Sequence, residues 1–208
     1  MFKKVLVLFL LLHGIILYAN NDPKEILITV QYKKEKHQFT RAQIELVNMI
    51  LIEAKKKPNK FGETFGKTLV YIALAESSLG NNLIGDFKVD VPITKASLGN
   101  FQFQVLTIKD LAWAFNDLKW LRDKSEQWIA NKLLKDKDFQ MEMALWNIKR
   151  LSETDFRKDS WEKIVSGWNG GVWNKKYLQN IYKYRSIALV LLKKMDELGL
   201  LAVPLEEI

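Results

Sequence analysis

The sequence predicts a mostly α-helical domain, and two observations support this fold class. From Leu106 to the end of the chain, apolar side chains recur at helical spacing in one segment after another. Earlier, residues 81–100 combine glycine, proline, aspartate and short β-prone pieces, which is typical of a loop or a small hairpin. We therefore expect a helical domain with one small irregular or β-hairpin insertion, placed directly after a buried helix.

The bulk composition limits what kind of protein this is. The chain has 208 residues, of which 48% are hydrophobic and 12% aromatic, enough for one packed domain or a domain with a small appendage. It contains no cysteine, which excludes disulfides, thiol catalysis and cysteine metal sites. Its two histidines, His13 and His37, disfavour a histidine metal site or a Ser–His–Asp triad. We expect no metal and no cofactor.

The first nineteen residues resemble a secretory signal peptide. Lys3 and Lys4 precede an apolar body of about fifteen residues, and Leu17 and Ala19 occupy the −3 and −1 positions for cleavage after Ala19. The alternative is an uncleaved anchor, but the apolar run is short for a membrane span. No cysteine follows, so a lipoprotein anchor is excluded. We expect a periplasmic or secreted protein that has no membrane segment after cleavage.

The positive charge does not by itself select a partner. The chain has a formal charge of +8, which falls to +6 when Lys3 and Lys4 leave with the leader. Basic secreted proteins meet cell-wall polymers, anionic lipid and nucleic acid. The lysines are spread along the predicted helices without an arginine-rich, aromatic-interleaved stripe, which indicates a solvated surface and no nucleic-acid partner.

The N-terminal part of the mature chain predicts one strand and one helix. Ile26–Tyr32 is β-prone, and Thr40 with Gln43 three residues later forms a capping box before an apolar helical pattern. Lysines at 55–57 and a proline end this helix. We treat residues 20–60 as an N-terminal extension and first helix packed on a domain that spans residues 61–208.

The central stretch is Thr68–Gly80. Seven consecutive apolar residues, Leu69–Ala75, lead into Glu76, so a helix here is buried on every side. We expect this helix to begin near Thr64 and to stop at Gly80. Burial and the negative end of the helix both raise the pKa of Glu76, as a general acid requires. The alternative is a helix-end glutamate that reaches solvent or pairs with a lysine.

The remaining helices follow from apolar periodicity and capping signals. They are expected over Leu106–Leu118, Ser125–Leu134, Asp138–Leu151 and Trp161–Trp168, the last capped by Asp159. A break at Gly170-Gly171 precedes a long final helix, from about Lys175 to Leu198.

Three short polar segments interrupt these apolar patterns, each at a helix boundary, where side chains and free backbone groups face a common site most easily. Trp168 and Phe101 offer flat faces for sugar rings, and Gln102 and Asn169 offer both donors and acceptors. Singly, each segment also fits a turn, a cap or a core aromatic. The segments are Glu76-Ser77, Gly99-Asn100-Phe101-Gln102 and Trp168-Asn169-Gly170-Gly171.

In this order, the segments resemble the lysozyme-like domain of soluble lytic transglycosylases, which are relatives of goose-type lysozymes. That family has Glu-Ser at the end of a buried helix, then Gly-Leu-Met-Gln, then an aromatic residue with Asn-Ala-Gly, then a tyrosine in the next helix. The tyrosine here is Tyr177, with Tyr182 and Tyr184 as competitors, and the resemblance covers about Phe61 to Leu192. The chain departs from the pattern at Asn100, Phe101, Trp168 and Gly170.

The resemblance implies a lysozyme-like α+β fold and cleavage of the β-1,4 bond between N-acetylmuramic acid and N-acetylglucosamine in peptidoglycan glycan strands. Glu76 would first act as the acid and then as the base toward the C6 hydroxyl, giving a 1,6-anhydro end without metal or cofactor. Ser77 would orient the Glu76 carboxyl, unless it bonds its own backbone. Trp168, Gln102 and Asn169 would hold the glycan, and Tyr177 would hydrogen-bond near the acid.

Other functions remain open at this stage. A hydrolase with a protein nucleophile needs a second carboxylate, for which Asp86 and Asp90 are candidates unless they are surface-turn residues. A non-catalytic peptidoglycan-binding or scaffold protein could keep the same fold, although the intact Glu76 argues against it. The segment before Phe61 is the natural place for a partner protein of an envelope machine to dock.

Overall fold

A computed structural model describes residues 22–57, 65–86, 91–153, 160–169 and 174–207. Within these ranges the protein is mostly helical, with two small two-stranded antiparallel sheets, which confirms the predicted fold class. The expected signal peptide, Asp90, Asp159, Gly170 and Gly171 lie outside the described residues.

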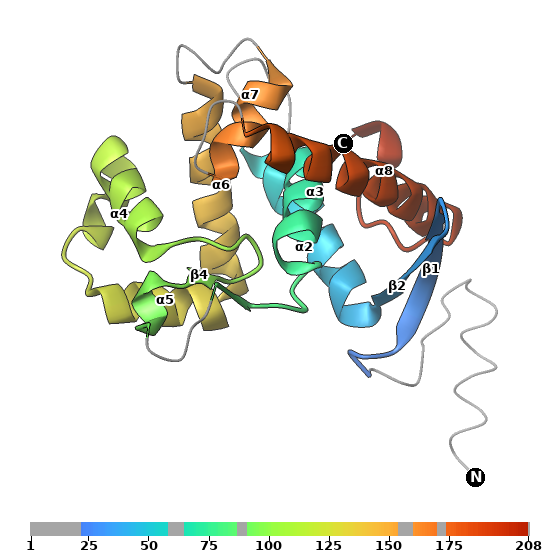
Figure 1. The fold of residues 1–208 in the computed structure, drawn as a ribbon, viewed down its shortest axis with the longest axis horizontal. Coiled ribbons are helices and arrows are strands. Elements are labelled where there is room, and N and C mark those ends of the chain that lie inside the picture. Colours follow the sequence, from blue (N-terminus) through green and yellow to red (C-terminus); the bar gives the residue numbers. More distant parts are fainter. Residues whose placement is uncertain (1–21, 58–64, 87–90, 154–159, 170–173, 208) are drawn as a thin grey trace.

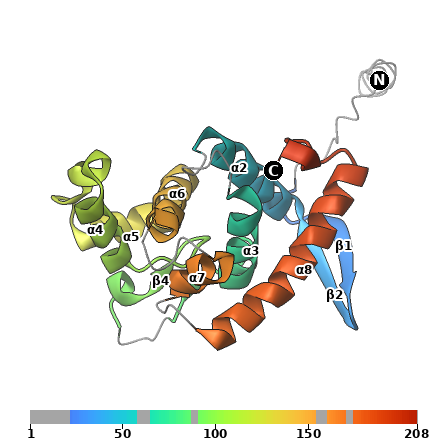
Figure 2. The ribbon, with the colours of Figure 1, turned by 90° about the horizontal axis from the view of Figure 1, so that it is seen from above.

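The first element of the described residues is a β-hairpin made of β1 (Ile26–Tyr32) and β2 (Glu35–Thr40). Strand β1 was expected, but β2 was missed because its sequence is polar and only Phe39 becomes fully buried. Pairing brings Ile28 opposite Phe39, and these two side chains are buried with Val30. The hairpin packs against helices at both ends of the chain, α2 and α8 (Figures 1 and 2).

Helix α2 (Arg41–Lys56) begins after Thr40, as expected, and Gln43 Oε1 accepts the Thr40 N–H at 2.8 Å. Helix α3 (Gly66–Ser77) packs between α2 and α8. Its side chains from Leu69 to Leu74 are all buried, which confirms the prediction of a helix that is apolar on every side.

The end of α3 differs from the prediction. Ser78, not Gly80, takes the left-handed conformation that ends the helix, with φ 53° and ψ 45°, and the next two residues also have positive φ. The N–H groups of Ser78 and Leu79 donate to the carbonyls of Leu74 and Ala73, a Schellman-type ending. The Leu79 side chain is only 2% exposed, so its burial helps to hold a conformation that glycine would adopt more readily.

The predicted insertion after α3 is a small hairpin. Strand β3 (Ile84–Gly85) pairs with β4 (Ser97–Leu98), with a 3₁₀ turn η1 (Ile93–Lys95) before β4. This confirms a small β-hairpin insertion directly after the buried helix.

The rest of the described chain is helical. Phe115 adopts an extended conformation that divides the predicted Leu106–Leu118 helix in two, and its ring packs on Trp146 with a centroid separation of 4.6 Å. The predicted Trp161–Trp168 helix likewise becomes an α-helix followed by a 3₁₀ turn. The elements are α4 (Val105–Ala114), η2 (Asn116–Leu121), α5 (Glu126–Lys135), α6 (Lys137–Glu153), α7 (Trp161–Ser166), η3 (Gly167–Asn169), α8 (Lys175–Glu197) and η4 (Leu205–Glu207).

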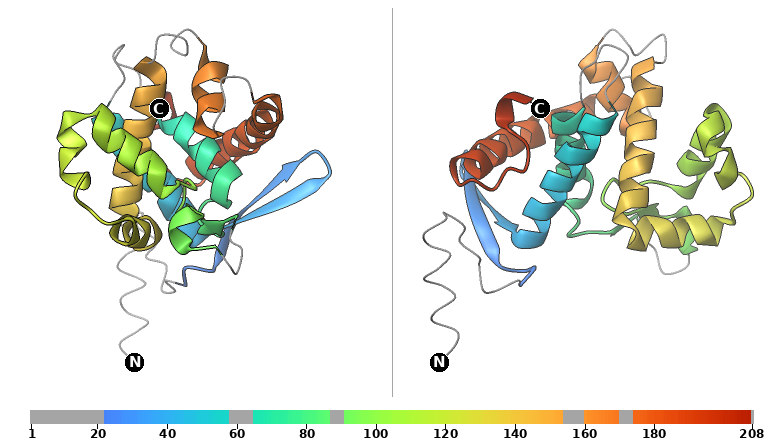
Figure 3. Two further views of the ribbon diagram at one scale, coloured as in Figure 1. Left: turned by 60° about the vertical axis from the view of Figure 1, so that its left-hand side comes forward. Right: turned by 180° about the vertical axis from the view of Figure 1, so that it is seen from behind.

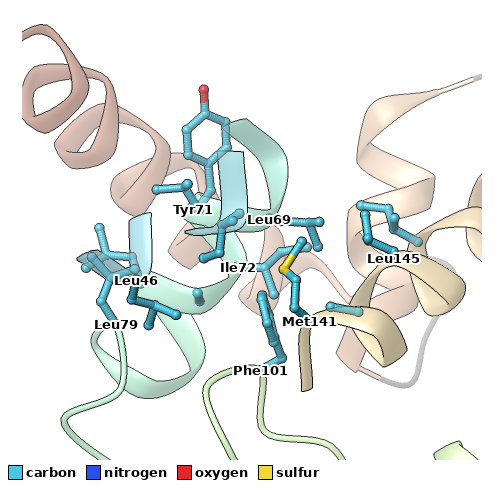
Figure 4. Close-up of a cluster of buried hydrophobic side chains, with 14 of the residues drawn as sticks. Leu46, Leu69, Tyr71, Ile72, Leu79, Phe101, Met141 and Leu145 are labelled. Atoms are coloured by element: carbon cyan, nitrogen blue, oxygen red, sulfur yellow. The ribbon is translucent and has the colours of Figure 1, made fainter. Parts of the chain in front are cut away.

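Helix α6 stands between two groups of elements. In Figures 1 and 3, α4 and α5 lie on one side of α6, and α2, α3 and α8 lie on the other. Figure 4 shows how Ile72 of α3, Met141 of α6 and Phe101 of the loop after β4 meet in the buried cluster. Among the described helices, none has the length and apolar character needed to cross a membrane.

Candidate active site

The structure brings Tyr177 onto Glu76. Glu76 lies in the last turn of α3 and is largely buried, and the buried Tyr177 lies in the first turn of α8. The Tyr177 hydroxyl donates to Glu76 Oε1 at 2.7 Å. Asn174 fixes the start of α8 because its Oδ1 accepts the Tyr177 N–H at 3.0 Å. Residues 101 positions apart in the sequence therefore meet at the ends of two packed helices.

A third segment reaches the same carboxyl. The side chain of Asn169, at the end of η3, lies near this carboxyl and acts as a donor that lowers its pKa. The preceding helix α7 is tied to α3 because Trp161 Nε1 donates to Thr68 Oγ1 at 3.0 Å. This bond anchors the segment that carries Asn169 to the helix that carries Glu76.

These surroundings raise the pKa of Glu76 above its ordinary value. Burial is the largest cause, the hydrogen bonds from Tyr177 and Asn169 partly oppose it, and the negative charge of Asp86 adds to the rise. The pKa of Tyr177 is raised well above its ordinary value, first by burial and then by the Glu76 carboxyl. Tyr177 thus stays a donor, while Glu76 holds its proton to a higher pH than an exposed glutamate.

The hydrogen bond from Tyr177 also makes the two carboxyl oxygens of Glu76 chemically different. Oε1 accepts the Tyr177 proton, and the carbonyl oxygen is the better acceptor of a protonated carboxyl, so this bond favours Oε2 as the oxygen that carries the proton of Glu76. Oε2 is therefore the atom that can give a proton to a bound molecule and take one back.

Ser77 does not contact the carboxyl that it was expected to orient. Its fully buried hydroxyl donates to the Asn100 carbonyl at 2.7 Å, lies 3.1 Å from the Ala73 carbonyl, and accepts the Gly80 N–H at 2.8 Å. The alternative interpretation, a helix-end serine that bonds backbone, describes it correctly. Ser77 joins the end of α3 to the loop after β4.

Gln102 lies within the insertion, with φ 52°. Its amide nitrogen donates to the carbonyls of Asn82 at 3.0 Å and Gly99 at 2.9 Å, which takes up both of its hydrogens. Its Oε1 lies so close to Gly85 that a Cβ there would collide with it. Gln102 therefore stabilises the hairpin. Both of its amide hydrogens are used in these bonds and are not free to bind a glycan.

The aromatic residues of the site divide into core and rim. Phe101 is fully buried, so it offers no face to a sugar, contrary to expectation. Trp168 remains partly exposed, packs against Phe103 at 5.3 Å, and donates from Nε1 to the Phe101 carbonyl at 3.2 Å. The competing Tyr182 donates to Glu162 at 2.8 Å, and Tyr184 packs against the core. Of these three tyrosines, Tyr177 is the one on Glu76.

Asp86, the candidate for a second carboxylate that lies within the described residues, is exposed in the turn after β3. Ser97 Oγ donates to its Oδ2 at 3.3 Å, across the base of the hairpin. Its charge acts on Glu76, so the two carboxyl groups share one electrostatic environment.

The sequence analysis did not predict two buried glutamine side chains, which bond to the backbone around the site. Gln43 Nε2 donates to the Ser78 carbonyl, and Gln140 Oε1 accepts the Asn100 N–H, both at 2.7 Å. The only signal in the sequence was a glutamine within each predicted helix, and Gln43 already had a role in the capping box. Gln43 fixes the turn that follows Glu76, and Gln140 fixes the loop after β4 that Ser77 joins to that turn.

Other parts of the surface offer cavities but not this chemistry. A cavity of about 740 Å³ lies at the junction of α5 and α6, and its titratable Asp136 has a lowered pKa because Lys132 and backbone N–H groups bond to it. Within the described ranges no group of three or more histidine, aspartate or glutamate side chains is placed to hold a metal ion. We therefore assign the candidate site to Glu76.

Comparisons with known proteins found no relative of this chain. A scan against protein-family models returned no match, and neither a search of curated proteins nor a search of solved structures found a similar chain.

Proposed function

We propose that this protein is a secreted or periplasmic peptidoglycan lytic transglycosylase with Glu76 as its general acid and base. The observation that carries the proposal is the largely buried Glu76 carboxyl, which accepts the Tyr177 hydroxyl and lies near the Asn169 side chain. Its raised pKa suits a group that gives and then takes a proton near neutral pH. The motif order shared with lysozyme-like transglycosylases is consistent with this chemistry.

The reaction requires one proton donor and no water. Oε2 of Glu76 would protonate the oxygen that leaves the anomeric carbon as the C1–O4 bond breaks. The resulting carboxylate would take the proton of the C6 hydroxyl of the muramoyl residue as O6 bonds to C1. The protons balance, because Glu76 gives one proton, takes one back and ends protonated, as it began. Tyr177 stabilises the carboxylate form between the two steps.

Substrate contacts fall to residues at the rim of the site. Trp168 is partly exposed beside Asn169, and an indole face next to an amide suits an N-acetylated sugar. Ser77 and Gln102 contribute indirectly, since they hold the backbone on which these groups depend.

The test is release of soluble fragments from purified peptidoglycan by the mature protein and by Glu76→Gln. We expect the variant to lose about 10²-fold or more of the activity, the usual contribution of a general acid. Glu53→Gln is the matched control, because Glu53 pairs with Lys56 at 2.6 Å on α2. Full activity of Glu76→Gln would refute the proposal.

One observation favours a second candidate, a muramidase that uses water. Asp86, in the turn after β3, adds a negative charge that raises the pKa of Glu76, and a hydrolase needs a second carboxylate beside the acid. Asp86→Asn separates the two. A hydrolase that depends on Asp86 loses its activity, whereas a transglycosylase keeps it and shows only a lower pKa of Glu76.

A further inference from the structure

A second groove, separate from Glu76, runs along the junction of α5 and α6. Two cavities of about 740 and 440 Å³ adjoin there and share the side chains of Trp128, Lys132, Asp136 and Asp138. Each volume lies in the range of ligand-binding clefts. We refer to this surface as the α5–α6 groove.

An exposed tryptophan forms one wall of the α5–α6 groove. Trp120 of η2 is 43% exposed and meets Trp128 edge to face, with centroids 5.9 Å apart. Trp128 is held in turn by Phe139 at 5.9 Å and by the ammonium groups of Lys124 and Lys132 over its ring, at 5.4 and 5.6 Å. The packed Trp128 thus serves as a rigid support, and Trp120 presents an indole surface to solvent.

Two charged side chains of the groove, Asp136 and Lys132, are held by hydrogen bonds, and the charges that line the groove nearly cancel. Asp136 accepts the Phe139 N–H at 2.9 Å and the Lys132 ammonium at 2.6 Å, so the connection between the two helices is rigid. Among the residues that line the groove, three cations are balanced by three carboxylates, and Lys124 over Trp128 adds one further cation, although the whole chain carries +8. The balanced groups are Lys132, Lys135 and Lys137 with Asp136, Asp138 and Glu142.

This balance limits the class of ligand. A polyanion is attracted by clustered positive charge, which the groove lacks. A partner helix needs an apolar stripe, and most of the residues that line the groove are charged. A neutral sugar needs a flat aromatic face together with amide and carboxylate groups that bond its hydroxyls. Trp120 and Asp138 line one of the two cavities, and Asn131 and Asp138 line the adjoining one.

We propose that the α5–α6 groove is an accessory site for a neutral run of N-acetylhexosamines in a glycan strand. The identity of that glycan as peptidoglycan rests on the proposed function. Helix α5 is packed directly on the insertion beside Glu76, since a Cβ on Gly99 would lie 2.5 Å from the Leu133 carbonyl oxygen. A strand bound in the groove therefore lies on a helix that packs directly against the insertion beside Glu76.

The test measures binding in the absence of turnover. Glu76→Gln, and the same chain with Trp120→Ala, Trp120→Phe or Trp113→Ala added, are titrated against purified insoluble peptidoglycan and against chitotetraose. Trp113 is the matched control because it is 70% exposed on α4 and stacks on Arg122 instead of lining the groove. Thermal melting confirms that each variant is folded.

We expect Trp120→Ala to weaken binding to peptidoglycan about tenfold, as loss of a central aromatic contact does. Trp120→Phe should recover most of it, and Trp113→Ala should match the parent. Binding of chitotetraose should change little between about 50 and 300 mM salt, because a neutral ligand is not screened. Equal binding by Trp120→Ala and Trp113→Ala, no binding by the parent, or steep weakening of chitotetraose binding with salt would each overturn the accessory site. The proposed function fails separately, when wild-type protein releases no fragments.

Discussion

The hydrogen bond between Tyr177 and Glu76 makes a prediction that depends on its direction. Tyr177→Phe removes the hydroxyl that donates to Oε1 at 2.7 Å and leaves the buried ring in place. The hydroxyl favours the ionised carboxylate, so its loss leaves burial less opposed and raises the pKa of Glu76 further. The alkaline limb of the activity profile, where the acid loses its proton, should move to higher pH.

The size of the effect follows from the two charge states of the acceptor. A hydrogen bond to a charged group contributes about 1.5–3 kcal/mol and one to a neutral group about 0.5–1.5 kcal/mol. The difference of about 1 kcal/mol corresponds to about a fivefold larger protonated fraction on the alkaline limb. The maximal rate should fall at the same time, because the carboxylate formed during the reaction loses its stabilising donor.

The assay is fragment release from peptidoglycan across the pH range, with each profile scaled to its own maximum. Tyr182→Phe is the matched control, since that hydroxyl bonds to Glu162 and not to Glu76. We expect its profile to superpose on that of the wild type. An alkaline limb that stays in place in Tyr177→Phe, or that moves to lower pH, would refute the assignment of Glu76 as the titrating acid.

Three further predictions concern folding stability. Because the pKa of Glu76 is raised in the folded protein, its protonation stabilises the fold below the ordinary glutamate pKa, and this contribution is lost as the pH rises through the pKa of the folded state. The melting temperature of Glu76→Gln relative to wild type should therefore be higher at pH 7 than at pH 4. The same difference at both pH values would contradict this. Ser77→Ala should lower the free energy of unfolding in urea by about 1–3 kcal/mol, because it leaves the buried carbonyl of Asn100 unpaired, and an unchanged midpoint would oppose it. Gly99→Ala should destabilise more than Gly199→Ala, since both have positive φ but only Gly99 meets other atoms; equal urea midpoints would be evidence against the tight packing.

The fold was largely predictable because its main elements depend on local patterns. The apolar run before Glu76 and the turn-rich residues after Gly80 predicted a buried helix and a hairpin insertion, and both are present. Strand β2 was not predictable because its polar sequence becomes a strand only by pairing with β1. The early helix end at Ser78 depends on burial of the next side chain, Leu79, which no local pattern reports.

The sequence predicted which residue types form the candidate site, but not where each side chain points. Glu76, Asn169 and Tyr177 were selected from the sequence, and the fold brings these three side chains together. Ser77 and Gln102 were selected by the same motifs, but they turn toward backbone carbonyls, because a polar side chain that is buried or half-buried must satisfy nearby groups first. Such choices are set by tertiary contacts, which motif order does not contain.

The proposed chemistry is tested most directly by mass spectrometry of the fragments released from purified peptidoglycan in ¹⁸O-labelled water, with Glu76→Gln beside the wild type. Intramolecular attack by the C6 hydroxyl predicts muropeptides one water molecule lighter than reducing ends, without label, from the wild type only. Labelled reducing ends would contradict the transglycosylase reaction, and would direct attention to the hydrolase that Asp86 suggests. Equal release by both proteins would contradict the role of Glu76 itself.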